Sequence, residues 1–159
     1  MSAHQFEFAT IDGGTLSLGD MAGQVVLVVN TASQCGFTPQ YRELEGLWGQ
    51  FRDRGFVVVG VPSNDFGAQE PGSEMEILDF CSVNYSISFP LTIKQTVIGA
   101  DAHPFYRWII DQAGEDAAPK WNFHKYLIDG QGQLAQIYPS KVNPLDAPVV
   151  RDIEALLKR

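Results

Sequence analysis

The sequence predicts an α/β fold with a central mixed β-sheet, helices on both faces and an N-terminal β-hairpin. Three observations carry this prediction. Two near-continuous apolar runs, 24–30 and 56–61, have the pattern of strands buried on both faces. The segment between them has apolar residues at helical spacing. Short strand-like runs flank Asp-Gly turns at 12–13 and at 129–130, which is typical of β-hairpins.

The first half of the chain contains one hairpin and one strand–helix–strand unit. We expect Thr38 to be the N-cap of the helix and Pro39 its first residue, with Gly55 after its end. A crossover helix is needed between parallel neighbours, so the two buried strands should be parallel. The expected elements are the hairpin strands 6–11 and 15–18, the strand 24–30, the helix 39–54 and the strand 56–61.

The second half begins with a helix whose start is marked by Ser73 and Glu76, the spacing of a capping box. The remaining expected elements are a short strand, a helix, a hairpin and a closing amphipathic helix, at 89–93, 101–113, 123–128 with 134–138, and 146–158. This order is compatible with a thioredoxin-like fold, and also with other three-layer folds.

Composition restricts the class of protein. The 159 residues fit a single domain, 1–159, that buries its core without disulfides. The net charge of −8 argues against nucleic acid or an anionic membrane as the main partner. The first residues lack the basic and apolar regions of a secretory signal, and no apolar run is long enough to span a bilayer. We therefore expect a cytoplasmic protein without membrane insertion.

Two cysteines, Cys35 and Cys81, lie 46 positions apart, which is neither a CxxC motif nor a disulfide framework. Both are compatible with buried, inert thiols. Cys35, however, follows a buried strand and precedes a helix, where the helix dipole and free backbone N–H groups favour a thiolate. The three histidines show no ligand spacing with the cysteines, so we expect no metal site and no cofactor.

Four motifs stand in one order along nearly the whole chain. They are NTASQCG at 30–36, NDFGAQEPGS at 64–73, FCSVNYSISFP at 80–90 and KWNFHKYLID at 120–129. Together they resemble the motifs of the glutathione peroxidase family in its cysteine (non-selenium) form. The resemblance implies a thioredoxin-like fold and a thiol peroxidase that reduces hydrogen peroxide and organic or lipid hydroperoxides.

By this resemblance Cys35 is the peroxidatic residue, and Gln69, Trp121 and Asn122 complete the catalytic set. The residue types suit the chemistry. Neutral amide and indole N–H groups stabilise a thiolate without removing its charge, and they also stabilise charge on the departing oxygen. The sulfur attacks a peroxide oxygen and becomes a sulfenic acid. The source of the proton that the leaving oxygen takes up stays open between water and the thiol itself.

Cys81 stands where many members of the family carry a resolving cysteine. The resemblance implies that it attacks the oxidised Cys35 to form an internal disulfide, which thioredoxin reduces; glutathione is the weaker candidate donor. The alternative is that Cys81 only packs in its helix. The short segment 114–119 resembles that of the monomeric members of the family, so a monomer is expected.

Three departures from the family pattern concern the surroundings of Cys35. Ser63 stands where many relatives carry a third cysteine, Asp65 replaces a glutamine and Gln34 replaces a lysine. The last two make the surroundings less positive and disfavour docking of anionic glutathione. A rival function uses the same two cysteines: a hydroperoxide-sensing thiol relay that oxidises a partner protein.

Overall fold

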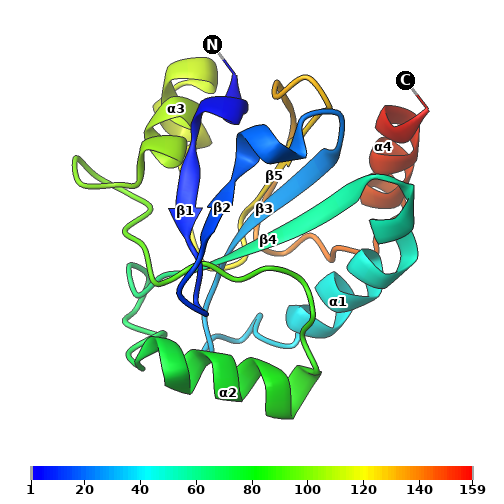
Figure 1. Cartoon of the computed structure of the whole chain (residues 1–159). Helices are drawn as coiled ribbons and strands as arrows, with labels where there is room; N and C mark the ends of the chain where they lie inside the picture. Colours follow the sequence, from blue (N-terminus) through cyan, green and yellow to red (C-terminus); the bar gives the residue numbers. More distant parts are fainter. Residues whose placement is uncertain (1, 159) are drawn as a thin grey trace.

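The computed structural model describes residues 2–158, and its centre is a four-stranded sheet in the order β4-β3-β5-β6 (Figure 1). Strands β3 (Val25–Thr31) and β4 (Phe56–Pro62) are parallel, as predicted. Strands β5 (Lys125–Ile128) and β6 (Leu134–Tyr138) form the predicted antiparallel hairpin, and β5 pairs antiparallel with β3. The sheet is therefore mixed.

The N-terminal hairpin forms a separate two-stranded sheet of β1 (Glu7–Ala9) and β2 (Thr15–Ser17), shorter than predicted. Short 3₁₀ helices occupy Ala3–Gln5, Leu18–Met21, Arg52–Arg54 and Glu115–Ala117.

Helices cover both faces of the sheet (Figure 1). One core joins the sheet to α1 (Gln40–Phe51) and α4 (Ala147–Leu157), and the other joins it to α3 (Pro104–Ala113) and the N-terminal hairpin. Helix α2 (Glu74–Tyr85) lies at the bottom of the view and contributes to the first core. The predicted mixed sheet with helices on both sides is confirmed.

Every residue of β3 and β4 is buried, which explains their near-continuous apolar sequences. Successive side chains point to opposite faces. In β3, Val25, Leu27 and Val29 enter the core under α1, while Val26 and Val28 enter the core under α3. Both faces of the sheet thus have to be covered before these strands are stable.

The predicted strand at 89–93 is wrong. Leu91 makes one parallel bridge with Gly60, and Thr92 makes one antiparallel bridge with Thr10. Pro90 has no N–H to donate and contributes only its carbonyl, which accepts from the Gly60 N–H at 2.9 Å. A segment that pairs through one residue on each side does not extend into a ladder.

Two helix starts show how the caps act. The capping box of Ser73 and Glu76 is present at the start of α2, as predicted. Helix α3 begins at Pro104 rather than near 101. The Nδ1 atom of His103 accepts the Phe105 N–H at 3.1 Å and caps this helix, so the residues before His103 lie outside it.

Candidate active site

The loop after β3 holds Cys35 in a tight, buried turn. The Cys35 N–H donates to the Thr38 hydroxyl at 2.9 Å, and that hydroxyl donates to the Ala32 carbonyl at 2.8 Å. The predicted role of Thr38 as N-cap is therefore wrong, because its side chain is used to close the cysteine loop. Pro39 stands at the N-cap position, and α1 begins at Gln40.

The sulfur of Cys35 accepts a hydrogen bond from the backbone. The Phe37 N–H lies 3.3 Å from Sγ, and the side chain of Cys35 is only 8% exposed. A backbone N–H therefore points at the sulfur, and it comes from the turn before α1 rather than from the first residues of the helix.

A second loop, after β4, brings Gln69 to the cysteine loop. The Gln34 N–H donates to the Gln69 carbonyl at 3.0 Å, and the Ser33 hydroxyl donates to the Glu70 carboxylate at 2.9 Å. Glu70 is buried, and burial raises the pKa of its carboxyl. Ser33 and Gln34 of the cysteine loop are therefore hydrogen-bonded directly to Glu70 and Gln69 of the second loop.

A third segment, before β5, carries Trp121 and Asn122. Asn30, fully buried near the end of β3, holds it at three points. Its side chain donates to the Trp121 carbonyl at 3.0 Å and accepts the His124 N–H at 3.1 Å. Its carbonyl accepts the Phe123 N–H at 2.6 Å. This network supports the left-handed backbone of Phe123, whose φ is 65°.

The second and third segments meet through their side chains. Asn122 donates from Nδ2 to the Oε1 of Gln69 at 2.9 Å. The rings of Trp121 and Phe66 are 5.8 Å apart, and a Cβ on Gly67 would lie only 3.1 Å from the Trp121 ring. Glycine at 67, with φ of +67°, is thus what allows the loop to approach the indole. Gln69, Trp121 and Asn122 form one contact cluster attached to the cysteine loop.

Cys81 lies on α2 and is completely buried in the same core as Cys35; both thiols are free. Burial raises the pKa of the Cys81 thiol to about 11, against the opposing effect of the neighbouring Tyr41 hydroxyl. The apolar residues of α2 are not all buried. Ile77 is buried, but Leu78 is 38% exposed.

Asn30 and Thr38 organise the candidate site, and these roles were not predicted from the sequence. Both are polar residues buried at the edge of an apolar strand or helix start, where an unpaired polar group is costly. Their position inside or next to the NTASQCG motif was the available signal.

A shallow, largely apolar groove of about 450 Å³ lies beside the site. Trp121 and Phe37 line it, and two lysines, Lys120 and Lys141, also belong to its wall. The remaining lining residues are Asp116, His124, Ile137, Pro139 and Ser140. The groove therefore connects two segments of the candidate site to solvent.

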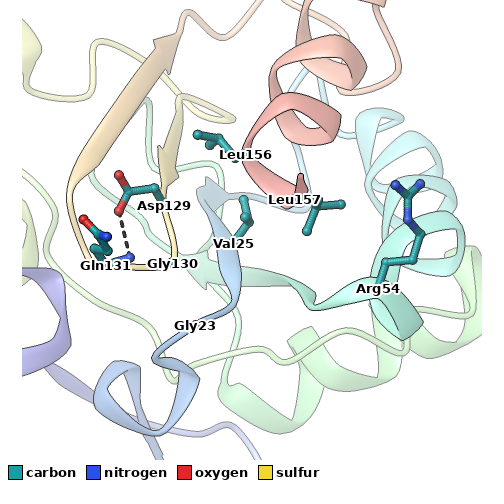
Figure 2. Close-up of a pocket in the computed structure, with 8 residues that line it drawn as sticks. All are labelled: Gly23, Val25, Arg54, Asp129, Gly130, Gln131, Leu156 and Leu157. Atoms are coloured by element: carbon teal, nitrogen blue, oxygen red, sulfur yellow. Dashed lines mark hydrogen bonds between the residues drawn. The ribbon is translucent and has the colours of Figure 1, made fainter. Parts of the chain in front are cut away.

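Another pocket, of about 260 Å³, lies elsewhere and contains none of the predicted site residues (Figure 2). Gly23 and Val25 at the start of β3 line it, together with Leu156 and Leu157 of α4. In parallel sheets, sites form beyond the carboxyl ends of the strands, and this pocket is at the opposite end of β3. The loop of Cys35 therefore remains the candidate site.

Within residues 2–158, no group of three or more histidine, cysteine or acidic side chains is arranged to hold a metal ion. None of the helices in that range combines the length and the apolar character that crossing a bilayer requires.

Comparisons with known proteins identify the family of the chain. The family model described as glutathione peroxidase matches residues 3–110. The hydroperoxy fatty acid reductase gpx1 of Synechocystis sp. is 44% identical over 160 residues, which cover 96% of this chain and 94% of that protein. The glutathione peroxidase-like peroxiredoxin gpx1 of Schizosaccharomyces pombe is 45% identical, with 92% of each chain covered.

Solved structures define the fold. The crystal structure of Trgpx in apo form matches with a TM-score of 0.80 at 32% identity, covering 100% of this chain and 97% of that one. A thioredoxin family thiol:disulfide interchange protein from Chlorobium tepidum matches with a TM-score of 0.71 at 18% identity, covering 96% and 92%. The fold class is thus thioredoxin-like, as predicted. Within this class, the chain belongs to the glutathione peroxidase family.

Proposed function

We propose that this protein is a thiol peroxidase in which Cys35 reduces hydrogen peroxide and organic hydroperoxides to water and alcohols. One observation carries the proposal. The buried Cys35, with a backbone N–H on its sulfur, shares a hydrogen-bonded loop pair with Gln69, which in turn contacts Asn122. A nucleophile next to a set of neutral donors is the arrangement that this reaction needs.

In the first step the Cys35 thiolate attacks one peroxide oxygen. The S–O bond forms, the O–O bond breaks, and the sulfur gives up two electrons to become a sulfenic acid. The departing oxygen leaves as water or alcohol after taking up one proton. Because Oε1 of Gln69 already accepts from Asn122, the Nε2 group of Gln69 remains as a donor toward the peroxide. We assign the Trp121 indole N–H a similar role.

In the second step the Cys81 thiol attacks the sulfenic acid. A disulfide forms between Cys35 and Cys81, and the sulfenic oxygen leaves as water with the thiol proton and its own. A Cys81 with no exposed surface and a pKa of about 11 does not attack from the closed structure. Helix α2 therefore has to open locally before this step.

Thioredoxin is the reductant we propose for this disulfide, with glutathione as the weaker donor. The name of the fission yeast relative, a peroxiredoxin, is in line with a protein dithiol as donor. Neither Gln34 nor Asp65 supplies the positive charge that would attract anionic glutathione. We propose a monomer in the cytoplasm, in line with the short segment 114–119.

The groove beside Trp121 supports organic hydroperoxides as substrates. Its wall is mainly apolar, which suits an acyl chain, and its two lysines suit an acidic head group. The cyanobacterial relative is named a hydroperoxy fatty acid reductase, and we extend that substrate class to this chain.

The experiment is a stoichiometric oxidation. Reduced protein receives one equivalent of hydroperoxide, and the products are mapped by mass spectrometry. We expect a Cys35–Cys81 disulfide in the wild type, a sulfenic acid at Cys35 in Cys81→Ser, and no peroxide consumption by Cys35→Ser. Consumption at the wild-type rate by Cys35→Ser would exclude the proposed nucleophile. A trapped mixed disulfide with one specific protein, and no turnover with thioredoxin, would favour the sensor instead.

A further inference from the structure

Lys125 is a fully buried lysine at the start of β5. Its neighbours on the strand, Tyr126 and Leu127, are core residues. The Nζ atom donates to the Phe123 carbonyl at 2.6 Å and to the Ser140 carbonyl at 3.2 Å. Burying an ammonium is costly unless it is paired, so a lysine here has to be explained.

The first of these carbonyls belongs to a strained residue. Phe123 has a φ of 65°, which is rare for a bulky side chain, and it directly follows Asn122. Its N–H donates to the Asn30 carbonyl at 2.6 Å, and its C=O accepts from Lys125. The residue is thus held from both sides. Strained residues of this kind persist only where their surroundings fix them.

The second carbonyl links the lysine to the cysteine side of the site. Ser140 also accepts a hydrogen bond of 2.7 Å from Nε2 of Gln40. Gln40 is buried, is the first residue of α1, and stands five positions after Cys35. A continuous path of hydrogen bonds therefore runs from Phe123 through Lys125 and Ser140 to Gln40.

Stability alone does not account for this lysine. Even a buried ion pair can often be replaced by apolar residues of similar volume without loss of stability. Burial lowers the pKa of Lys125 to about 7, against the opposing effect of Asp146. The surroundings of Lys125 therefore disfavour its positive charge. What an apolar side chain of the same length lacks is the pair of donors to Phe123 and Ser140.

We propose that Lys125 is a positioning residue of the peroxide-reducing site: it fixes the segment that carries Trp121 and Asn122 relative to the helix that follows Cys35. The proposal rests on the function proposed above. Lys125 contacts neither peroxide nor sulfur in this account. It acts through the carbonyl next to Asn122, and a displacement of about 1 Å in such a group slows a reaction up to about 100-fold.

The test compares Lys125→Met with a matched control, Tyr126→Phe. Tyr126 is the next residue on the strand, is equally buried, and its hydroxyl donates to the Ala117 carbonyl at 2.6 Å. Each substitution removes buried hydrogen bonds from the same strand. The rate constant for oxidation of Cys35 is measured in a single turnover with hydrogen peroxide. We expect it to fall about 10- to 100-fold in Lys125→Met and to stay at the wild-type value in Tyr126→Phe.

A double-mutant cycle separates positioning from general destabilisation. If Lys125 acts by placing Asn122, then Lys125→Met should have an effect of less than about 3-fold in an Asn122→Ala background. An unchanged rate in Lys125→Met, or an equal loss in both backgrounds, would overturn the proposal. These results leave the proposed function intact, since that function fails only if Cys35→Ser still consumes peroxide.

If Lys125→Met does not fold, Gln40→Met tests the same path. It removes the other donor to the Ser140 carbonyl without placing a change in the strand. We expect slower oxidation of Cys35, again with little further effect in the Asn122→Ala background. Oxidation at the wild-type rate in a folded Gln40→Met protein would overturn the proposal in that case.

Discussion

Asn122 donates a hydrogen bond of 2.9 Å from its amide nitrogen to Oε1 of Gln69, although the two residues are 53 positions apart in the chain. The bond determines the orientation of the Gln69 amide, because its oxygen is occupied and its nitrogen is not. Asn122 therefore acts on the site by directing the donor of Gln69, because its own amide nitrogen donates to Gln69 and, at 3.5 Å, to the Phe66 carbonyl. The two residues should not behave independently.

The first prediction concerns this pair. Gln69→Ala and Asn122→Ala should each slow the reaction of Cys35 with peroxide by on the order of 100-fold, because the first removes an oriented donor and the second removes the hydrogen bond that orients it. The double variant should lose less than the product of the two single losses, since Asn122 orients Gln69. The measurement is the second-order rate constant for oxidation of Cys35. Losses that multiply would show that the hydrogen bond between them has no part in the reaction.

The second prediction separates Cys81 from the peroxide reaction. Cys81→Ser should leave the first oxidation of Cys35 nearly unchanged, because Cys81 is buried on α2 and has no role in that step. Turnover supported by thioredoxin should be lost, because no internal disulfide forms for it to reduce. The Cys35 sulfenic acid should also be over-oxidised more readily, having lost the thiol that traps it.

Steady-state peroxide consumption with thioredoxin and mass spectrometry of Cys35 measure these two effects. Normal turnover of Cys81→Ser with thioredoxin would contradict the two-cysteine cycle. Cys81 would then be a packing residue of α2, and direct reduction of Cys35 by a thiol would be the better account.

Local patterns were enough to predict the sheet. The apolar runs at β3 and β4 have the pattern of strands buried on both faces. The Asp-Gly turn before β6 predicts the hairpin. The strand expected at 89–93 failed because a pairing partner, not a propensity, decides whether such a segment forms a ladder. In the structure, β4 meets this segment through an isolated bridge between Gly60 and Leu91.

The candidate site residues were predicted from motifs, but the residues that hold them in place were not. Gln69 and Asn122 were named from sequence, and the structure brings them into contact. Thr38 looked like a helix cap because it directly precedes Pro39. Its hydroxyl accepts the Cys35 N–H instead, and the sequence does not show which N–H a threonine bonds. Lys125 occupies a strand position, and alternation along a short strand does not show that a lysine points into the core. A local turn decides the case of Thr38, and tertiary packing decides the case of Lys125.

The third prediction concerns the opening of α2. Ser73→Ala removes the hydroxyl that accepts the Glu76 N–H at 3.2 Å in the capping box. Loss of such a cap costs about 1 kcal/mol, so local opening of α2 should become roughly 5-fold more frequent. Alkylation of Cys81 in the reduced protein should accelerate by the same factor, because this buried thiol reacts only when α2 opens.

Ser82→Ala is the control for the third prediction. Ser82 is exposed on the same helix, and only its backbone carbonyl, which alanine keeps, takes part in a cap. Alanine also has the higher helix propensity, so Cys81 should be alkylated at the wild-type rate or more slowly. Equal alkylation rates in Ser73→Ala and in the wild type would show that Cys81 is reached without opening the start of α2.

The last prediction concerns the pH dependence of stability. Burial and the nearby charges of Lys125 and Lys120 lower the pKa of His124 from 6.5 to about 4. Between these two pH values the unfolded chain binds a proton at this histidine and the folded chain does not. The contribution of His124 to stability is therefore complete above pH 6.5 and is lost progressively as the pH falls toward about 4.

His124→Phe keeps a ring against Tyr126, 5.1 Å away, and does not titrate. Urea unfolding of both proteins from pH 7 to pH 4 should show a flatter decline of the free energy of unfolding in the variant. Identical slopes would mean that His124 is protonated as easily in the folded protein as in the unfolded chain.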